Sequence, residues 1–212
     1  LDGLVALLCE SLVGREQQAA CGDRLLPDER ILEEPILVAG VFLDVEDVDL
    51  LIEDADFERV GVLGHSTGGG AIVEFCARDS RCKAGLGMDT YLEPVSDGVL
   101  SGGLEQPFLF MYSQAWPSAE NWQRFETLYA QSASPSYRVE IRGTAHYDFT
   151  DLPAFSPLSA ALGIKGPLDG ERAMKIINSY TLTFFNQHLR GHADLYLEGI
   201  APAYKEVIFQ KK

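Results

Sequence analysis

The chain has 212 residues, of which 46% are hydrophobic and 23% charged, and its formal net charge is −15. This length and composition are typical of one globular domain with a sizeable core. The negative charge argues against nucleic acid as a partner, because phosphate groups would be repelled. The sequence contains no apolar run near the roughly 20 residues of a membrane span, and residues 1–8 lack the basic start of a signal peptide.

The four cysteines do not have the spacing of a zinc site. Cys9, Cys21, Cys76 and Cys82 form no CxxC pair, and no set of histidines lies near them. We therefore expect neither a metal nor another cofactor. Pairing of Cys9 with Cys21 and of Cys76 with Cys82 would favour an extracytoplasmic protein, and four free buried thiols are the alternative. The compartment remains open.

Residues 1–56 form a lead-in with little regular pattern. We interpret residues 1–12 as a helix, 21–30 as a loop, 35–43 as a short apolar run, and 44–58 as an amphipathic helix with a solvated acidic face. This lead-in contains no HGGG-like turn, the element that supplies a second oxyanion donor in α/β-hydrolases. We therefore expect the N-terminal strands of such a fold to be missing from this chain.

From residue 57 onward, short apolar runs alternate with helical patterns. The predicted strands are residues 57–64, 82–89, 106–113 and 136–143, and the predicted helices are residues 68–79, 118–133 and 170–191. This alternation predicts an α/β fold with a mainly parallel sheet and flanking helices. We expect a single domain over residues 1–212, with its catalytic core at residues 57–191.

The two long C-terminal helix predictions come with end signals. Ser118 is expected to cap the helix over residues 118–133, and Gly191 is expected to end the last helix. In the last helix, the residues expected to face inward are Met174, Ile177, Phe184 and Leu189.

The stretch GHSTGGG, residues 64–70, contains the G-x-S-x-G pattern of a nucleophile elbow centred on Ser66. Gly64 and Gly68 would allow the tight turn, and the backbone N–H of Thr67 would donate to a developing oxyanion. A simple helix cap is the alternative role for Ser66. A phosphate-binding loop is disfavoured, because the stretch lacks the lysine of G-x-x-x-x-G-K.

A serine, an acid and a histidine each follow a predicted strand, in the order Ser66, Asp89 and His146. The carboxyl ends of parallel strands meet at one edge of a sheet, so these residues should lie together. His146 would take the serine proton, and Asp89 would orient the imidazole. Many hydrolases carry the acid one strand later, where the acid here is Glu120 in the first turn of a predicted helix, so we prefer Asp89.

Three other histidines and one loop have simpler interpretations. His65 is expected to pack beside the elbow. His188 and His192 lie four residues apart near a helix end, where we expect a favourable interaction with the helix dipole and no metal. Residues 151–170 are interpreted as a packed excursion, with a lid or a lipid-contacting loop as the alternative.

Taken together, the motifs resemble the platelet-activating factor acetylhydrolase family of the plasma and intracellular type-II kind. GHSTGG, MDTYLEP and IRGTAHYDFTD are similar to that family's GHSFGG, LDAW..P and IRG..H..F.D segments, with Tyr91 in place of a tryptophan and Thr67 in place of a phenylalanine. The resemblance covers residues 58–190. It implies an α/β-hydrolase fold, Asp89 as the acid, and a metal-independent serine esterase for short or oxidised acyl esters, often of phospholipids.

We therefore expect a serine carboxylic-ester hydrolase that forms an acyl-enzyme on Ser66, with His146 and Asp89 completing the triad. Its partner would be a small-molecule or lipid ester, with peripheral contact to lipid surfaces, and the sequence leaves the oligomeric state open. A thioesterase or acyltransferase with the same triad and a non-catalytic binding module on the hydrolase fold are the alternatives.

Overall fold

The chain folds around a six-stranded sheet, as seen in a computed structural model that describes residues 4–7, 56, 59–116, 118–133, 135–155 and 162–212. The strands follow one another across the sheet in chain order: β1 (Leu4–Leu7), β2 (Val60–His65), β3 (Cys82–Met88), β4 (Phe108–Ser113), β5 (Ser136–Ile141) and β6 (Val207–Lys211). Strands β1 to β5 are parallel, and β6 runs antiparallel to β5. The predicted mainly parallel α/β sheet is thus confirmed.

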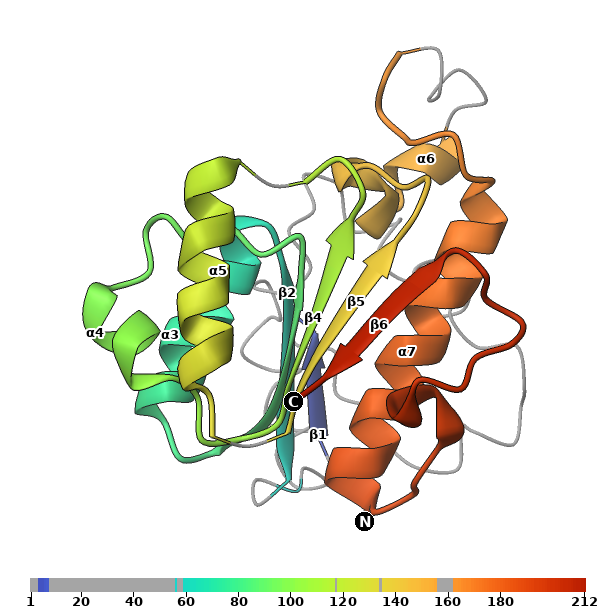
Figure 1. Cartoon of the computed structure of the whole chain (residues 1–212). Coiled ribbons are helices and arrows are strands. Elements are labelled where there is room, and N and C mark those ends of the chain that lie inside the picture. The colour runs from blue at the N-terminus through green and yellow to red at the C-terminus, as the bar shows by residue number, and fades with distance from the viewer. Residues whose placement is uncertain (1–3, 8–55, 57–58, 117, 134, 156–161) are drawn as a thin grey trace, which may run out of the picture.

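Helices cover both faces of this sheet, as Figure 1 shows. The helices are α3 (Thr67–Arg78), α4 (Asp97–Gly102), α5 (Ala119–Gln131), α6 (Leu152–Phe155) and α7 (Gly170–Arg190), with 3₁₀ turns η2 (His146–Phe149) and η3 (Leu195–Glu198). Helices α3, α4 and α5 lie on one side and α7 on the other. Right-handed crossovers between successive parallel strands place α3, α4 and α5 on one face, and α7, between β5 and the antiparallel β6, covers the other face.

Strand β4 is buried along its whole length, because helices cover both of its sides. Its side chains alternate between two apolar clusters. Phe110 packs on Phe125 of α5, with ring centroids 5.1 Å apart, whereas Met111 belongs to the cluster that contains Phe184 of α7. The C-terminal end of a central, fully packed strand is a rigid place on which to build a site.

The ends and the inner face of the long helices follow the predicted signals. The Ser118 hydroxyl accepts a hydrogen bond from the Asn121 backbone N–H at 3.1 Å, and α7 ends at Gly191 with a left-handed φ of 76°. Ile177, Phe184 and Leu189 are buried as expected. Met174 is only half-buried.

The interpretation of residues 1–12 as a helix is wrong for part of that segment, because Leu4–Leu7 form β1, parallel to β2. A short apolar run suits either a buried helix or a buried strand, and backbone pairing along the edge of β2 decides for the strand. Of the predicted acidic helix over residues 44–58, the structure describes Asp56 alone, and Asp56 is not helical. The run at 35–43 and the pair Cys9–Cys21 also lie outside them.

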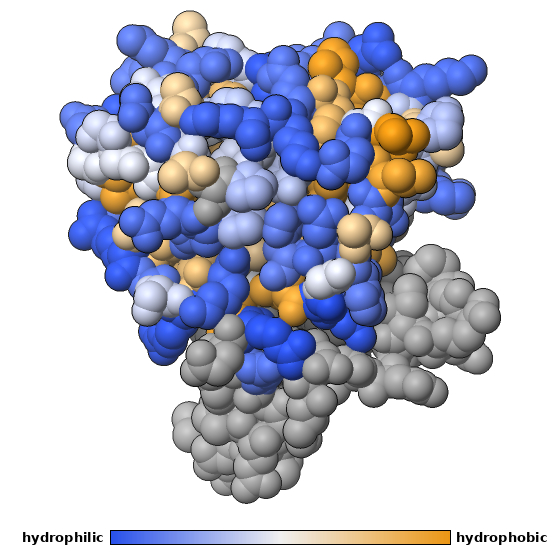
Figure 2. Space-filling model, turned by 60° about the horizontal axis from the view of Figure 1, so that its bottom comes forward, coloured by the Kyte–Doolittle hydropathy of each residue, from blue (hydrophilic) through white to orange (hydrophobic). Residues whose placement is uncertain are grey.

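Of the two alternatives for Cys76 and Cys82, the structure has the disulfide, which joins the end of α3 to the start of β3. On the face shown in Figure 2, most of the coloured surface is hydrophilic and the hydrophobic residues gather in small patches. None of the helices in the described ranges is long and apolar enough to span a bilayer.

Candidate active site

Ser66 occupies the sharp turn between β2 and α3. Its backbone has φ 56° and ψ −120°, a strained conformation for a residue with a side chain. The turn is fastened at both sides, because the Ser66 N–H donates to the Met88 carbonyl at 2.9 Å and the Ser66 carbonyl accepts from the Tyr91 N–H at 2.9 Å. The Ser66 hydroxyl makes no capping hydrogen bond to α3, which leaves it available for chemistry.

The glycines of the elbow differ in how much space a side chain would have at each position. A Cβ on Gly64 would collide with the backbone of Gly68, and a Cβ on Gly70 would collide with the carbonyl of Tyr91. A Cβ on Gly69 would meet the Thr90 hydroxyl at 3.0 Å, whereas one on Gly68 would meet no atom of the described chain within 4 Å. Close backbone approach therefore requires glycine at positions 64 and 70 in particular.

Asp89 and His146 come together at the carboxyl edge of the sheet. Asp89 directly follows β3, and His146 begins η2 after β5. His146 Nδ1 lies 3.1 Å from Asp89 Oδ2, within hydrogen-bond distance. Asp89 also has a left-handed φ of 41°, so the two non-glycine residues with positive φ in the described ranges are Asp89 and Ser66. Strained backbone of this kind is characteristic of functional sites.

The Asp89 carboxylate is fully buried and yet well supplied with hydrogen-bond donors. Its Oδ1 accepts from the Ser113 backbone N–H at 2.7 Å, and its Oδ2 accepts from the Ser113 hydroxyl at 2.7 Å. Burial is the largest effect and raises the pKa of the Asp89 carboxyl, while the hydrogen bonds from His146 and Ser113 act to lower it.

The His146 ring is held between two other rings. The Trp116 indole stacks on it with centroids 4.4 Å apart and planes 21° apart, and the His65 ring lies on it with centroids 4.4 Å apart. His65 Nε2 is 3.1 Å from the His146 carbonyl oxygen. Burial, followed by the charge of His146, lowers the pKa of His65 to about 4. His65 is therefore neutral at neutral pH and packs beside the elbow, as the sequence suggested.

The structure thus brings Ser66, Asp89 and His146 to one edge of the sheet. The Asp89–His146 hydrogen bond is present, and the Tyr91 N–H ties the Asp89 segment to Ser66. Among the described residues, no hydrogen bond joins the Ser66 hydroxyl to His146. Catalytic hydrogen bonds are often long before substrate binds, so this geometry is compatible with a triad. Thr67 is the first residue of α3, where backbone N–H groups have no partner within the helix.

Of the two histidines near the end of α7, His188 differs from the expectation. His188 Nε2 lies 3.1 Å from the Tyr137 hydroxyl, and burial, followed by the charge of Lys211, lowers the pKa of His188 to about 4. A neutral imidazole gains little from the helix dipole, so the expected dipole interaction of His188 is wrong at neutral pH. His192 is exposed. The described part of the chain contains no cluster of three or more potential metal ligands.

Sequence reasoning missed two residues of this site, Ser113 and Trp116. Ser113 is the last residue of β4 and Trp116 follows that strand, which lies between β3 and β5. The rule that chemistry sits at strand ends could have identified Ser113. No local pattern distinguishes Trp116, because its role depends on stacking against a ring that is distant in sequence.

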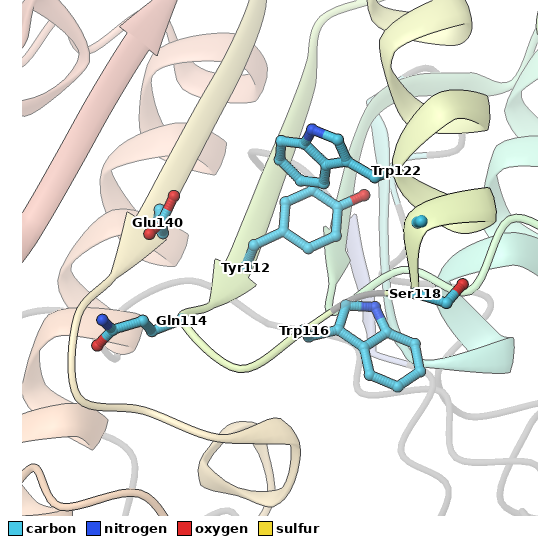
Figure 3. A pocket seen from close by; sticks show the side chains of 7 residues that line it. Tyr112, Gln114, Trp116, Ser118, Trp122 and Glu140 are labelled. Atoms are coloured by element: carbon cyan, nitrogen blue, oxygen red, sulfur yellow. The ribbon is translucent and has the colours of Figure 1, made fainter.

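A pocket of about 360 Å³ adjoins the site on the α5 side of the sheet. Figure 3 shows Tyr112 pointing between the indole rings of Trp116 and Trp122, with Gln114 and Glu140 across from them. Trp116 therefore contacts both this pocket and the His146 ring. Aromatic walls with a few polar groups are typical of sites for small ligands.

The segment over residues 151–170 is described at its two ends. The Gly166 N–H donates to the Asp148 carboxylate at 2.6 Å, and the Leu168 N–H donates to the Gly143 carbonyl at 2.8 Å. These bonds fasten the second end to the loop that carries His146. Residues 156–161 lie outside the described part of the chain.

Comparison with known proteins points to one family. The family model described as platelet-activating factor acetylhydrolase, isoform II, matches residues 38–199. The chain is 30% identical over 150 residues to the platelet-activating factor acetylhydrolase of Bos taurus. This alignment covers 69% of this chain and 33% of that protein. It is 26% identical over 170 residues to a probable 1-alkyl-2-acetylglycerophosphocholine esterase of Arthroderma benhamiae, covering 71% of this chain and 43% of that protein.

The fold also matches a solved structure. A ferulic acid esterase from Streptomyces cinnamoneus superposes with a TM-score of 0.73 at 22% identity, over 99% of this chain and 74% of that one. At this identity the match shows a shared fold. The chain spans about a third of the length of the mammalian relatives it matches.

Proposed function

Because the chain belongs to the platelet-activating factor acetylhydrolase, isoform II, family, we propose that it hydrolyses carboxylic esters with Ser66 as nucleophile, His146 as general base and Asp89 as the orienting acid. The observation that carries this proposal is the 3.1 Å hydrogen bond between Asp89 Oδ2 and His146 Nδ1, beside a serine in a strained elbow. An imidazole held through Nδ1 presents Nε2 to the nucleophile.

In the proposed reaction, Ser66 Oγ attacks the acyl carbonyl carbon as His146 Nε2 takes the hydroxyl proton. The tetrahedral intermediate collapses to an acyl-enzyme, and the leaving alkoxide receives that proton from His146. Water then attacks the acyl-enzyme with His146 as base, which releases the carboxylic acid and restores the Ser66 hydroxyl. Asp89 stabilises the imidazolium that forms in each half of the cycle.

The negative oxygen of the intermediate requires preorganised donors. The N–H of Thr67 is the donor that we assign, because it lies at the first position of the twelve-residue helix α3 directly after Ser66. Losing one such donor typically costs about 2.7–4 kcal/mol in the transition state. We assign no residue to the second donor.

For the substrate, we propose an ester with a short acyl group on a lipid. The names of the relatives, which refer to platelet-activating factor and to an alkyl-acetyl-glycerophosphocholine, support this class. The pocket of about 360 Å³ beside Trp116 supports a subsite for an apolar group of such an ester. Three exposed apolar side chains that follow His146 support peripheral contact with lipid: Tyr147 (47% exposed), Leu152 (43%) and Leu162 (67%).

The test is hydrolysis of p-nitrophenyl esters of increasing acyl length, combined with labelling by an organophosphonate that is located by mass spectrometry. We expect the chain to release p-nitrophenol and to carry the label on Ser66. The variant Ser66→Ala should lose more than about a thousandfold in kcat and take no label. Ser101→Ala, an exposed serine in α4, is the matched control and should keep both properties.

Each alternative has its own outcome in this experiment. A chain that neither turns over any ester nor takes the label would overturn the esterase proposal and favour a binding module. Faster release of acyl groups from thioesters, or their transfer to an added alcohol in preference to water, would favour a thioesterase or an acyltransferase with the same residues.

A further inference from the structure

The Asp89 carboxylate is held from the neighbouring strand by a single residue, Ser113. The Ser113 N–H donates to Asp89 Oδ1 and its hydroxyl donates to Asp89 Oδ2, both at 2.7 Å. Both side chains are buried, with Asp89 0% and Ser113 1% exposed. Oδ2 is also the oxygen that faces His146 Nδ1, so Ser113 and His146 share one acceptor.

The sheet fixes the relative position of these two residues. In the β3–β4 ladder Met88 pairs with Met111, and the Asp89 N–H donates to the Met111 carbonyl at 2.8 Å. Asp89 and Ser113 therefore leave adjacent parallel strands side by side, at the edge where the site is formed. A support built on a central strand has little freedom to move away from its partner.

We propose that Ser113 is a positioning residue of this site: its N–H and hydroxyl lock the Asp89 carboxylate in the orientation that aims Oδ2 at His146, and keep that carboxylate ionised. The inference rests on the proposed function, because its effect on activity requires the Asp89–His146 pair to be catalytic. Ser113 is placed where many hydrolases carry the acid itself, one strand after Asp89.

The physical need for such a support follows from burial. A buried carboxylate without donors becomes protonated, and a protonated Asp89 no longer stabilises an imidazolium. Without the Ser113 hydroxyl, Oδ2 would keep His146 as its one side-chain donor among the described residues. The carboxylate would then be held by the Ser113 N–H and His146 alone, and it would be harder to ionise.

The experiment compares Ser113→Ala with Ser132→Ala by pH profiles of kcat and kcat/KM on p-nitrophenyl acetate. Ser132 is an equally buried serine that donates to the Leu128 carbonyl and accepts from the Leu104 N–H at the end of α5. We expect Ser113→Ala to lower kcat about tenfold or more with little change in KM, and to shift the acid limb of both profiles away from its wild-type position. Ser132→Ala should alter neither the limb nor kcat.

A second variant, Ser113→Cys, and a proton NMR measurement that requires no substrate test the inference independently. Ser113→Cys retains a weaker donor of similar size, so its acid limb should shift in the same direction as that of Ser113→Ala but by less. It also provides a test if Ser113→Ala does not fold. Proton NMR should show a low-field His146 Nδ1–H signal in the wild type that is weakened or lost in the Ser113 variants. The inference would be overturned if the Ser113 variants kept the acid limb at its wild-type position and their NMR signal were unchanged.

Failure of the proposed function leaves a different signature. If the wild-type chain hydrolyses no ester and Ser66 takes no organophosphonate label, the esterase proposal falls. The NMR comparison of wild type with the Ser113 variants then still decides whether Ser113 orients the Asp89–His146 pair.

Discussion

The indole of Trp116 lies nearly parallel to the imidazole of His146, with ring centroids 4.4 Å apart and an angle of 21° between the planes. A ring face in this position attracts a cation more strongly than a neutral ring. The proposed mechanism makes His146 an imidazolium in each transition state. Trp116 should therefore stabilise the transition state more than the resting enzyme.

Replacing Trp116 with leucine should lower kcat/KM about fivefold, because an aromatic contact of this kind contributes roughly 1 kcal/mol. Trp116→Phe keeps a ring face and should retain most of the activity. The measurement is kcat/KM on p-nitrophenyl acetate for the three proteins. Equal activity of the leucine and phenylalanine variants would show that the ring itself contributes nothing.

The elbow glycines should differ in their tolerance of alanine. Gly64→Ala places a methyl group against the Gly68 backbone, which cannot move without opening the turn, so we expect loss of activity and of soluble protein. Gly68→Ala places its methyl group where no described atom lies within 4 Å and should fold normally. Thermal unfolding and turnover of the two variants check this pair. Equal tolerance at both positions would contradict the close approach at Gly64.

The disulfide between Cys76 and Cys82 closes a short loop, with a sequence separation of 6. Chain entropy predicts a contribution of about 2 kcal/mol to the free energy of unfolding for a loop of this size. The double variant Cys76→Ala/Cys82→Ala should lose about that amount in urea denaturation. Adding a reductant should destabilise the wild type and leave the double variant unchanged. A reductant effect of equal size in both proteins would assign it to a disulfide other than Cys76–Cys82.

Stability should fall as the solution is acidified, because His65 and His188 are buried in their neutral forms. Burial lowers the pKa of each to about 4, whereas an unfolded histidine takes up its proton near pH 6.5. Between these values the unfolded state binds more protons, so the contribution of these two histidines to the free energy of unfolding decreases as pH falls and levels off below about pH 4.

Urea denaturation between about pH 7.5 and pH 4 measures this fall, and His188→Gln isolates one part of it. Glutamine keeps a donor for the Tyr137 hydroxyl but does not titrate. The decrease in the free energy of unfolding should be smaller in this variant than in the wild type. An identical decrease would show that His188 is not buried as a neutral ring.

The aromatic pocket should influence which esters are hydrolysed. Ala119 lines the pocket and is itself exposed, so Ala119→Trp can fill the space with little cost to the core. We expect KM to rise severalfold for p-nitrophenyl octanoate and to stay unchanged for the acetate. A uniform change for both esters would argue against a subsite for the acyl chain, and Ala119→Ser serves as the control of similar size.

The sequence predicted β2, α3, β3, β4, α5, β5 and α7 because each has a strong local signal. It did not predict the short elements α4, η2 and α6. Alternating apolar runs, the Ser118 cap and the Gly191 stop depend on neighbours along the chain, and they lie where they were expected. The helix prediction over residues 1–12 was wrong at Leu4–Leu7, because this run has no local feature that separates a helix from a strand. Pairing with β2, which is remote in sequence, decides its conformation.

By itself the sequence determined which residues stand at the ends of the strands, namely Ser66, Asp89 and His146, because strand ends follow from local patterns. The tertiary structure alone decided how these ends meet. The Asp89–His146 and Asp89–Ser113 hydrogen bonds join residues 57 and 24 positions apart, and they depend on strand register and side-chain rotamers. The stacking of Trp116 on His146 has the same origin. Directional contacts between distant residues exist only once the sheet has aligned its strands.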